Sequence, residues 1–170
     1  MVYCSFLNVG LDPDGGGILR EPVILANRHL SKGVAMSNEQ NDPLRVIAVD
    51  DSPSVIAHFK QLVSEMTGIE VIGTAKDGLE ALALLKEKGV PDLVVMDIVM
   101  PRMDGLTTLR TMKASYPDIR VAMLSSVAGS RSRAEEAFRL GAVQVITKPF
   151  DGPKLRDLFG AEKTQKGRKG

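Results

Sequence analysis

The sequence predicts an α/β fold: one five-stranded parallel sheet, doubly wound, with five helices covering both of its faces. Between residues 45 and 159, short apolar runs alternate with segments of helical periodicity, five of each kind. The apolar runs are nearly continuous, which is typical of strands that helices bury on both faces. With 170 residues, of which 44% are hydrophobic and 25% charged, the chain is long enough for one packed domain and some additional length.

The first strand is predicted at Arg45–Val49, because its sequence RVIAV is almost entirely apolar. A helix is predicted over residues 53–66, where apolar side chains recur with the spacing of one helical face. The members of that face are Val55, Ile56, Phe59, Leu62, Val63 and Met66. Ser52 is placed to cap this helix, and Pro53 suits its first position, where the missing N–H costs no hydrogen bond.

The later strand–helix units follow the same pattern. The second unit has a strand at Glu70–Thr74, a turn at Asp77-Gly78 and a helix at Leu79–Lys88, which Gly89 ends. The other strands are predicted at Leu93–Met96, Val121–Leu124 and Val143–Ile146, and the other helices at Leu106–Ser115, Ser130–Leu140 and Pro153–Phe159. Right-handed crossovers bring the carboxyl ends of all five strands to one edge of the sheet, where such sheets bind ligands.

Two segments lie outside this pattern. Residues 1–43 are rich in glycine and proline and lack either period, so we expect a disordered extension, or a start assigned too early with Met36 heading the product. The folded domain is expected over residues 44–160. Residues 161–170 belong to a basic stretch beginning at Gly160 and are expected to form a frayed basic tail.

Composition excludes several classes of protein. The formal net charge of +1 argues against a protein that coats nucleic acid or acidic membranes. The single cysteine, Cys4, has no internal disulfide partner, and no Cys/His cluster suggests zinc. No apolar run approaches the ~20 residues of a membrane helix, and no leader for export opens the chain. We therefore expect a soluble cytoplasmic protein.

Polar side chains follow four of the five predicted strands. The first strand leads into Asp50 and Asp51, the third into Asp97, the fourth into Ser125 and the fifth into Lys148. Each alone suits a cap, a turn or a surface lysine, but together they place three carboxylates, a hydroxyl and an ammonium at one edge. Neighbouring carboxylates repel each other by roughly 4 kcal/mol per pair at ~4 Å with an effective dielectric near ~20. Oxygen ligands that need a counter-charge favour a hard cation such as Mg²⁺.

This combination suits phosphoryl transfer to a carboxylate. A divalent cation keeps the carboxylates ionised and binds the oxygens of an incoming phosphoryl group. Attack of a carboxylate on phosphorus forms an acyl phosphate, and the charge that develops on the phosphoryl oxygens requires donors. Ser125 and Lys148 are placed to supply these donors, and the small Ser126 leaves room for the phosphoryl donor.

Over residues 44–160, the chain resembles the receiver domain of two-component response regulators. Four stretches carry the resemblance: Asp50-Asp51-Ser52, the run MDIVMPRMDG from Met96 to Gly105, Ser125-Ser126, and Lys148-Pro149-Phe150. The resemblance implies a flavodoxin-like sheet of strand order 2-1-3-4-5. It also implies a signalling switch that catalyses only its own phosphoryl transfer and dephosphorylation.

The resemblance implies a role for each residue of the site. Asp97 would accept the phosphoryl group of a histidine kinase's phosphohistidine. Lys148, preceding a cis bond to Pro149, would pair with the phosphate, and Ser125 would be the switch hydroxyl. The ligands of Mg²⁺ would be Asp50, Asp51, Asp97 and the backbone carbonyl of Val99.

Three valines qualify this resemblance. The family usually has an aromatic switch residue three positions before the lysine, where this chain has Val145; the usual rotamer switch is therefore in doubt, while phosphorylation is not. Val99 and Val127 stand two residues beyond Asp97 and Ser125, at positions that flank the path of the hydrolytic water in the family. We expect these apolar side chains to slow dephosphorylation.

Other functions fit the sequence less well. A haloacid-dehalogenase-type phosphatase also uses an aspartyl nucleophile, but it needs a second acid where Val99 stands. No GxGxxG follows a strand, and no GxxxxGK[ST] is present, which disfavours dinucleotide-binding and P-loop enzymes. A binding module with a dead site would have lost one of the landmarks. A purely structural α/β domain would need all of them to coincide by chance.

The expected output is a protein contact. After residue 160 the chain is too short for a DNA-binding domain, so we expect no DNA partner. Phosphorylation would reshape the face made by the last two helices and the fifth strand. The segments around Ser125 and Lys148 are similar to receivers of chemotaxis proteins, including that of the methylesterase. We therefore expect a single-domain, CheY-like regulator, with a histidine kinase upstream and a flagellar motor or kinase complex downstream. A phosphorelay intermediate or a regulator of another pathway is the alternative.

Overall fold

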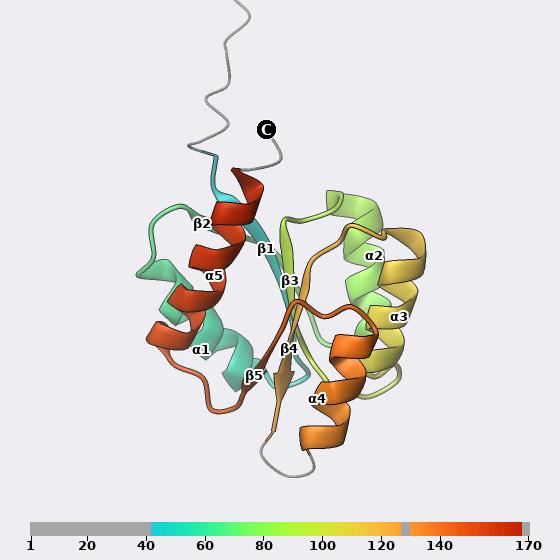
Figure 1. The fold of residues 1–170 in the computed structure, drawn as a ribbon. Helices are drawn as coiled ribbons and strands as arrows, with labels where there is room; N and C mark the ends of the chain where they lie inside the picture. The colour runs from blue at the N-terminus through green and yellow to red at the C-terminus, as the bar shows by residue number, and fades with distance from the viewer. Residues whose placement is uncertain (1–41, 127–129, 168–170) are drawn as a thin grey trace, which may run out of the picture. The chain divides into compact units, whose positions relative to one another are not determined.

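The structure, a computed structural model, describes residues 42–126 and 130–167. Five strands alternate with five helices along this part of the chain (Figure 1). The strands are β1 (Leu44–Val49), β2 (Ile69–Ala75), β3 (Leu93–Asp97), β4 (Val121–Ser125) and β5 (Gln144–Thr147). The helices are α1 (Pro53–Ser64), α2 (Gly78–Lys88), α3 (Gly105–Ser115), α4 (Ser130–Arg139) and α5 (Gly152–Lys166). Each predicted element is present, with ends that shift by one or two residues except in α5.

All five strands pair in parallel in one sheet of order β2-β1-β3-β4-β5. This confirms the predicted fold class and strand order. In Figure 1, α1 and α5 lie on one face of the sheet and α2, α3 and α4 on the other. The order of the strands reverses at β1, so the ends of β1 and β3 meet at the position where such sheets bind ligands.

The sheet separates two hydrophobic cores. The first, here called the α1–α5 core, contains Phe59, Val63, Leu155, Leu158 and Phe159 from the two helices. The second, here called the α2–α4 core, contains Ala81, Leu85, Leu109, Met112 and Ala137 from the three helices. Every residue of β3 and β4 is buried, which explains why these strands read as continuous apolar runs.

Aspartates begin three of the helices. The side chains of Asp77, Asp104 and Asp151 each accept a hydrogen bond from a backbone amide in the first turn of α2, α3 and α5. Asp77 thus caps a helix directly instead of belonging to a separate turn. Ser52 does occupy the capping position of α1, but its side chain makes no capping bond. Its hydroxyl pairs instead with that of Ser54 at 2.9 Å, so the predicted side-chain cap is wrong.

The last helix extends to Lys166 instead of ending near Phe159. The basic residues expected to fray after Gly160 are therefore helical as far as Lys166, because several side chains of this turn have partners elsewhere in the domain. Buried Glu162 pairs with Arg120. The ammonium of Lys166 lies 2.9 Å from an oxygen of Asp92, and the ammonium of Lys163 donates to the carbonyl of Thr67 at 2.8 Å.

Some predictions lie outside the described residues. They concern the extension over residues 1–41, the side chain of Val127 and the end of the basic tail at residues 168–170. Within residues 42–126 and 130–167, no helix is both long enough and apolar enough to pass through a lipid bilayer.

Candidate functional site

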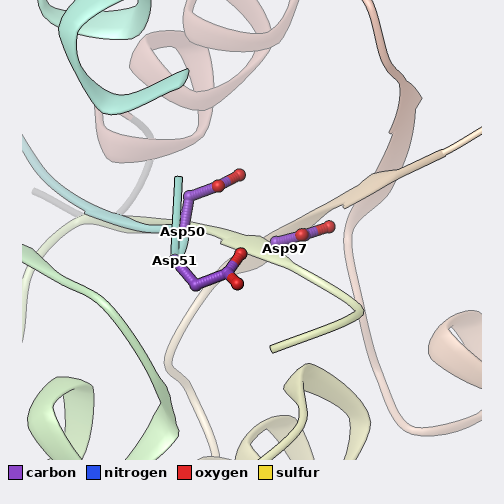
Figure 2. A group of neighbouring side chains, drawn as sticks. All are labelled: Asp50, Asp51 and Asp97. Carbon is purple, nitrogen blue, oxygen red and sulfur yellow. The ribbon is translucent and has the colours of Figure 1, made fainter. Parts of the chain in front are cut away.

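The three predicted carboxylates meet at the carboxyl ends of two neighbouring strands. Asp50 and Asp51 follow β1, and Asp97 is the last residue of β3, which pairs with β1. One carboxylate oxygen from each residue lies within 4.8 Å of the other two, and Figure 2 shows the three side chains beside each other. Asp50 and Asp97 are buried, at 3% and 7% exposure, whereas Asp51 is exposed. The cluster therefore opens to solvent on the side of Asp51.

Lys148 joins this cluster from the opposite end of the chain. Its ammonium lies 2.5 Å from Oδ2 of Asp50 and 2.9 Å from Oδ2 of Asp97. The backbone amide of Lys148 donates to the carbonyl of Ser125 at 2.7 Å, and the bond between Lys148 and Pro149 is cis. The segment after β5 is thus tied to the end of β4, which places the lysine over the two buried carboxylates.

Burial and charge act on these groups in opposite directions. Burial raises the pKa of Asp97 above its ordinary value, and the hydrogen bond from Lys148 offsets only part of that rise. Burial alone would lower the pKa of Lys148, but its bonds to Asp50 and Asp97 outweigh burial and raise that pKa. Lys148 is therefore a permanent cation at neutral pH. Asp97 is a more basic carboxylate than a solvated aspartate.

The hydroxyl of Ser125 lies at the same edge of the sheet but makes a local contact. Ser125 ends β4 and is 4% exposed, and its hydroxyl donates to the carbonyl of Ser126 at 3.3 Å. In the described part of the chain, its side chain has no hydrogen bond with a carboxylate of the cluster. Val145, at the position of the predicted switch, is partly buried and packs against the α2–α4 core.

The loop that follows Asp97 is closed tightly onto the start of α3. The amide of Gly105 donates to the carbonyl of Ile98 at 2.9 Å, and a Cβ at Gly105 would overlap the carbonyl oxygen of Asp97. Val99, within this loop, leaves 52% of its surface exposed. An apolar side chain therefore faces solvent two residues from the central carboxylate.

The donor set fits a hard divalent cation. The three carboxylates carry three formal negative charges, and Lys148 supplies one positive charge, so two negative charges remain uncompensated. A divalent ion matches that excess, and carboxylate oxygens are the ligands that Mg²⁺ prefers. Asp50, Asp51 and Asp97 are thus the side chains that would hold a divalent ion. The backbone carbonyl of Val99 is the further ligand expected from the sequence.

Sequence reasoning missed one charged cluster beside the site. Arg102, in the loop after β3, forms an ion pair with Asp77, whose carboxylate is fully buried, and a second with Glu80 at 3.1 Å. The spacing of Asp77 and Glu80 is that of a capping pair and could have identified Asp77 as a helix cap. No local pattern connects Arg102 with a carboxylate 25 residues earlier.

The chain is similar to a known family of domains. The model of the response regulator receiver domain matches residues 46–159. Among curated relatives, protein-glutamate methylesterase/protein-glutamine glutaminase 5 of Myxococcus xanthus is 40% identical over 107 residues, which cover 63% of this chain and 30% of the relative. The corresponding protein 2 of Rhodospirillum rubrum is 43% identical over 110 residues, 64% of this chain and 30% of the relative. The chain thus spans about 30% of the length of these relatives.

Solved structures of response regulator proteins are also similar to this chain. The response regulator domain of Thermotoga maritima CheB matches with a TM-score of 0.65 and 33% identity, covering 72% of this chain and 97% of that one. A chain of the CheX–CheY–BeF₃–Mg²⁺ complex of Borrelia burgdorferi matches with a TM-score of 0.63 and 32% identity, covering 69% and 90%.

Proposed function

Because the chain belongs to the family of response regulator receiver domains, we propose that it is a phosphorylation-dependent switch in which Asp97 accepts a phosphoryl group from a histidine kinase. The observation that carries this proposal is the position of Asp97. It is a buried carboxylate at the end of β3, with a lysine ammonium at 2.9 Å and two further carboxylates beside it. This arrangement provides a nucleophile, a cation for the transferred phosphate and a set of oxygen ligands for Mg²⁺ in one place.

The reaction transfers one phosphoryl group and leaves an acyl phosphate. An oxygen of Asp97 attacks phosphorus, an O–P bond forms, and the bond from phosphorus to the donor's imidazole nitrogen breaks, leaving its electron pair on that nitrogen. The ammonium of Lys148, already next to Asp97, stabilises charge on the phosphoryl oxygens. Ser125 turns its hydroxyl from the carbonyl of Ser126 toward the phosphate and acts as the switch. Asp50, Asp51, Asp97 and the backbone carbonyl of Val99 would hold Mg²⁺, which would supply the remaining charge compensation.

Incubation with acetyl phosphate and Mg²⁺ tests the proposal. Intact-mass measurement should show a gain of one phosphoryl group per chain, because acetyl phosphate can replace the kinase as donor. Asp97→Asn should abolish the gain, since the amide is not a nucleophile of this kind, and EDTA should prevent it. Asp118→Asn is the matched control: Asp118 is exposed and precedes β4, at the edge of the sheet opposite the site.

Two results would contradict the proposal. One is equal labelling of wild type and Asp97→Asn. The other is continuous turnover of the donor without a retained label, which is the behaviour of an aspartyl-nucleophile phosphatase.

We further propose that Val99 slows loss of the phosphate. Its exposed, apolar side chain offers no hydrogen bond to a water that attacks the acyl phosphate, whereas positioned polar groups accelerate such steps. Val99→Asn should therefore shorten the lifetime of the phosphorylated protein by about tenfold, measured by the decay of the phosphorylated mass after donor removal. Val90→Asn, which changes a valine of similar exposure (42%) before β3, should leave it unchanged. A wild-type lifetime of only seconds would contradict this role for Val99.

The pathway that we propose is chemotaxis. The relatives are named as protein-glutamate methylesterases, and one matching structure contains CheY. The proposed output is a protein contact at the face of α4, β5 and α5; Phe138 of α4 is 53% exposed. Binding of the phosphorylated protein to a flagellar motor switch peptide would support this pathway. Binding to a histidine phosphotransfer domain instead would favour a phosphorelay.

A further inference from the structure

The loop between β3 and α3, residues 98–104, is tied to the start of α2. The backbone amide of Gly78, in α2, donates a hydrogen bond to the carbonyl of Met103, in the loop, at 3.2 Å. At its tip, the side chain of Arg102 reaches Asp77, which caps α2, and Glu80 in its first turn. The loop that follows Asp97 therefore packs against the start of α2, which provides none of the carboxylates of the site and no lysine to it.

The partner of Arg102 is a carboxylate that is completely withdrawn from water. Nη2 of Arg102 donates to Oδ2 of Asp77, which is 0% exposed, and to Oε1 of Glu80 at 3.1 Å. The other oxygen of Asp77 accepts from the amide of Glu80 at 3.0 Å and caps α2. Asp77 is therefore fixed from two sides, and Arg102 supplies the cation that a buried carboxylate requires.

The backbone of Arg102 is in the left-handed region, with φ of 61°. Within residues 42–126 and 130–167, it is the one residue other than glycine with a positive φ. This conformation is unfavourable for a residue with a side chain and persists only where the surroundings hold it. The ion pairs with Asp77 and Glu80 tie the side chain of this residue to the start of α2.

We propose that Arg102 is a positioning residue for the metal site. By anchoring the loop to Asp77, it sets the position of the backbone of Val99 relative to the three carboxylates. This inference rests on the proposed function, in which the carbonyl of Val99 is a ligand of Mg²⁺. Residues that orient metal ligands typically alter metal affinity by about 10–100-fold. Because Arg102 contacts none of the carboxylates that take part in the reaction, it affects Mg²⁺ affinity far more than the rate at saturating Mg²⁺.

The test is a Mg²⁺ titration of the full chain, with the thermal unfolding midpoint as the readout, since a ligand of the folded state raises that midpoint. Arg102→Gly removes the cation but accepts the left-handed backbone, so it adds no backbone strain. The loss of the cation beside buried Asp77 should lower its unfolding midpoint without metal, so the shift of the midpoint with Mg²⁺ is what is compared. Arg102→Lys keeps a cation, and both ion pairs come from one nitrogen of Arg102, so a single ammonium can replace it. Arg110→Ala is the control, because the ion pair that Arg110 makes among the described residues is exposed and long, at 3.8 Å from Glu136.

The apparent dissociation constant for Mg²⁺ should rise about tenfold in Arg102→Gly. In Arg102→Lys it should stay within about threefold of wild type, and in Arg110→Ala it should not change. The rate of phosphorylation by acetyl phosphate at saturating Mg²⁺ should be close to wild type in all three variants.

A dissociation constant in Arg102→Gly within about twofold of wild type would overturn the inference, even if its unfolding midpoint without metal were lower. A wild-type protein that binds Mg²⁺ but gains no phosphate would overturn the proposed function instead. The two failures are therefore distinguishable.

Discussion

Replacing Gly105 with alanine is expected to destabilise the protein by about 3 kcal/mol or more. The new Cβ would overlap the carbonyl oxygen of Asp97 and lie 2.9 Å from the Cα of Ile98 and from the Cε of Met123. Two of these three atoms belong to the backbone of β3 and its loop, so they cannot move aside as the end of a flexible side chain can. Relief of the overlap requires α3 to move away from the strand that carries Asp97.

Urea denaturation followed by circular dichroism measures this effect, since the chain contains no tryptophan. Gly160→Ala is the matched control: Gly160 lies inside α5, and apart from the adjacent backbone of this helix its added Cβ would meet no described atom within 4 Å. This change should stabilise the protein by about 0.5–1 kcal/mol, because alanine favours the helix more than glycine does. A Gly105→Ala protein with the stability of wild type would contradict the close packing of α3 on β3.

Removal of Arg120 is expected to have a comparably large effect. Arg120 makes two hydrogen bonds to Glu162, one of them 2.8 Å long, and Glu162 is 4% exposed. Arg120→Met would leave the carboxylate buried without a cation, which should lower the free energy of unfolding by about 3 kcal/mol. This is the lower end of the usual range, because 32% of the Arg120 side chain is exposed and water can partly replace it.

A double variant separates the pair from its surroundings. Arg120→Met combined with Glu162→Leu removes both charges and should recover most of the lost stability. Glu162→Leu alone should cost less than Arg120→Met alone, because the freed guanidinium can turn to solvent. Denaturation of the three variants checks this order. Additive losses in the double variant would show that the two residues do not act as a pair.

Most of the fold could be predicted because its signals are local. Strands buried on both faces read as apolar runs, and right-handed crossovers bring their ends to one edge. The length of α5 could not be predicted in this way. Glycine is unfavourable inside a helix, so Gly160 indicates that the helix ends near it. The contact that stabilises the following turn joins Glu162 to Arg120, which lies 42 residues earlier.

The site, like the fold, has residues whose positions follow from local sequence signals and residues whose positions depend on distant contacts. Asp50, Asp51, Asp97 and Lys148 follow predicted strands, and their meeting is a consequence of the sheet order. By contrast, the pairing of Arg102 with Asp77 depends on a left-handed residue at the tip of a loop, and nothing in the local sequence specifies that conformation. Side-chain partners of this kind depend on how two elements pack, whereas strand ends depend only on topology.

The sheet divides the interior into two cores, and this affects how the site can change during evolution. Ile98 and Met100, which follow Asp97, belong to the α2–α4 core, whereas Phe150, which follows Lys148, belongs to the α1–α5 core. The segments that follow the proposed nucleophile and its lysine therefore pack in separate cores, whose substitutions contribute independently to stability where they share no neighbours. A substitution beneath one of these segments is therefore expected to move that segment more than the other. The distance between carboxylate and ammonium can thus evolve by repacking one side alone.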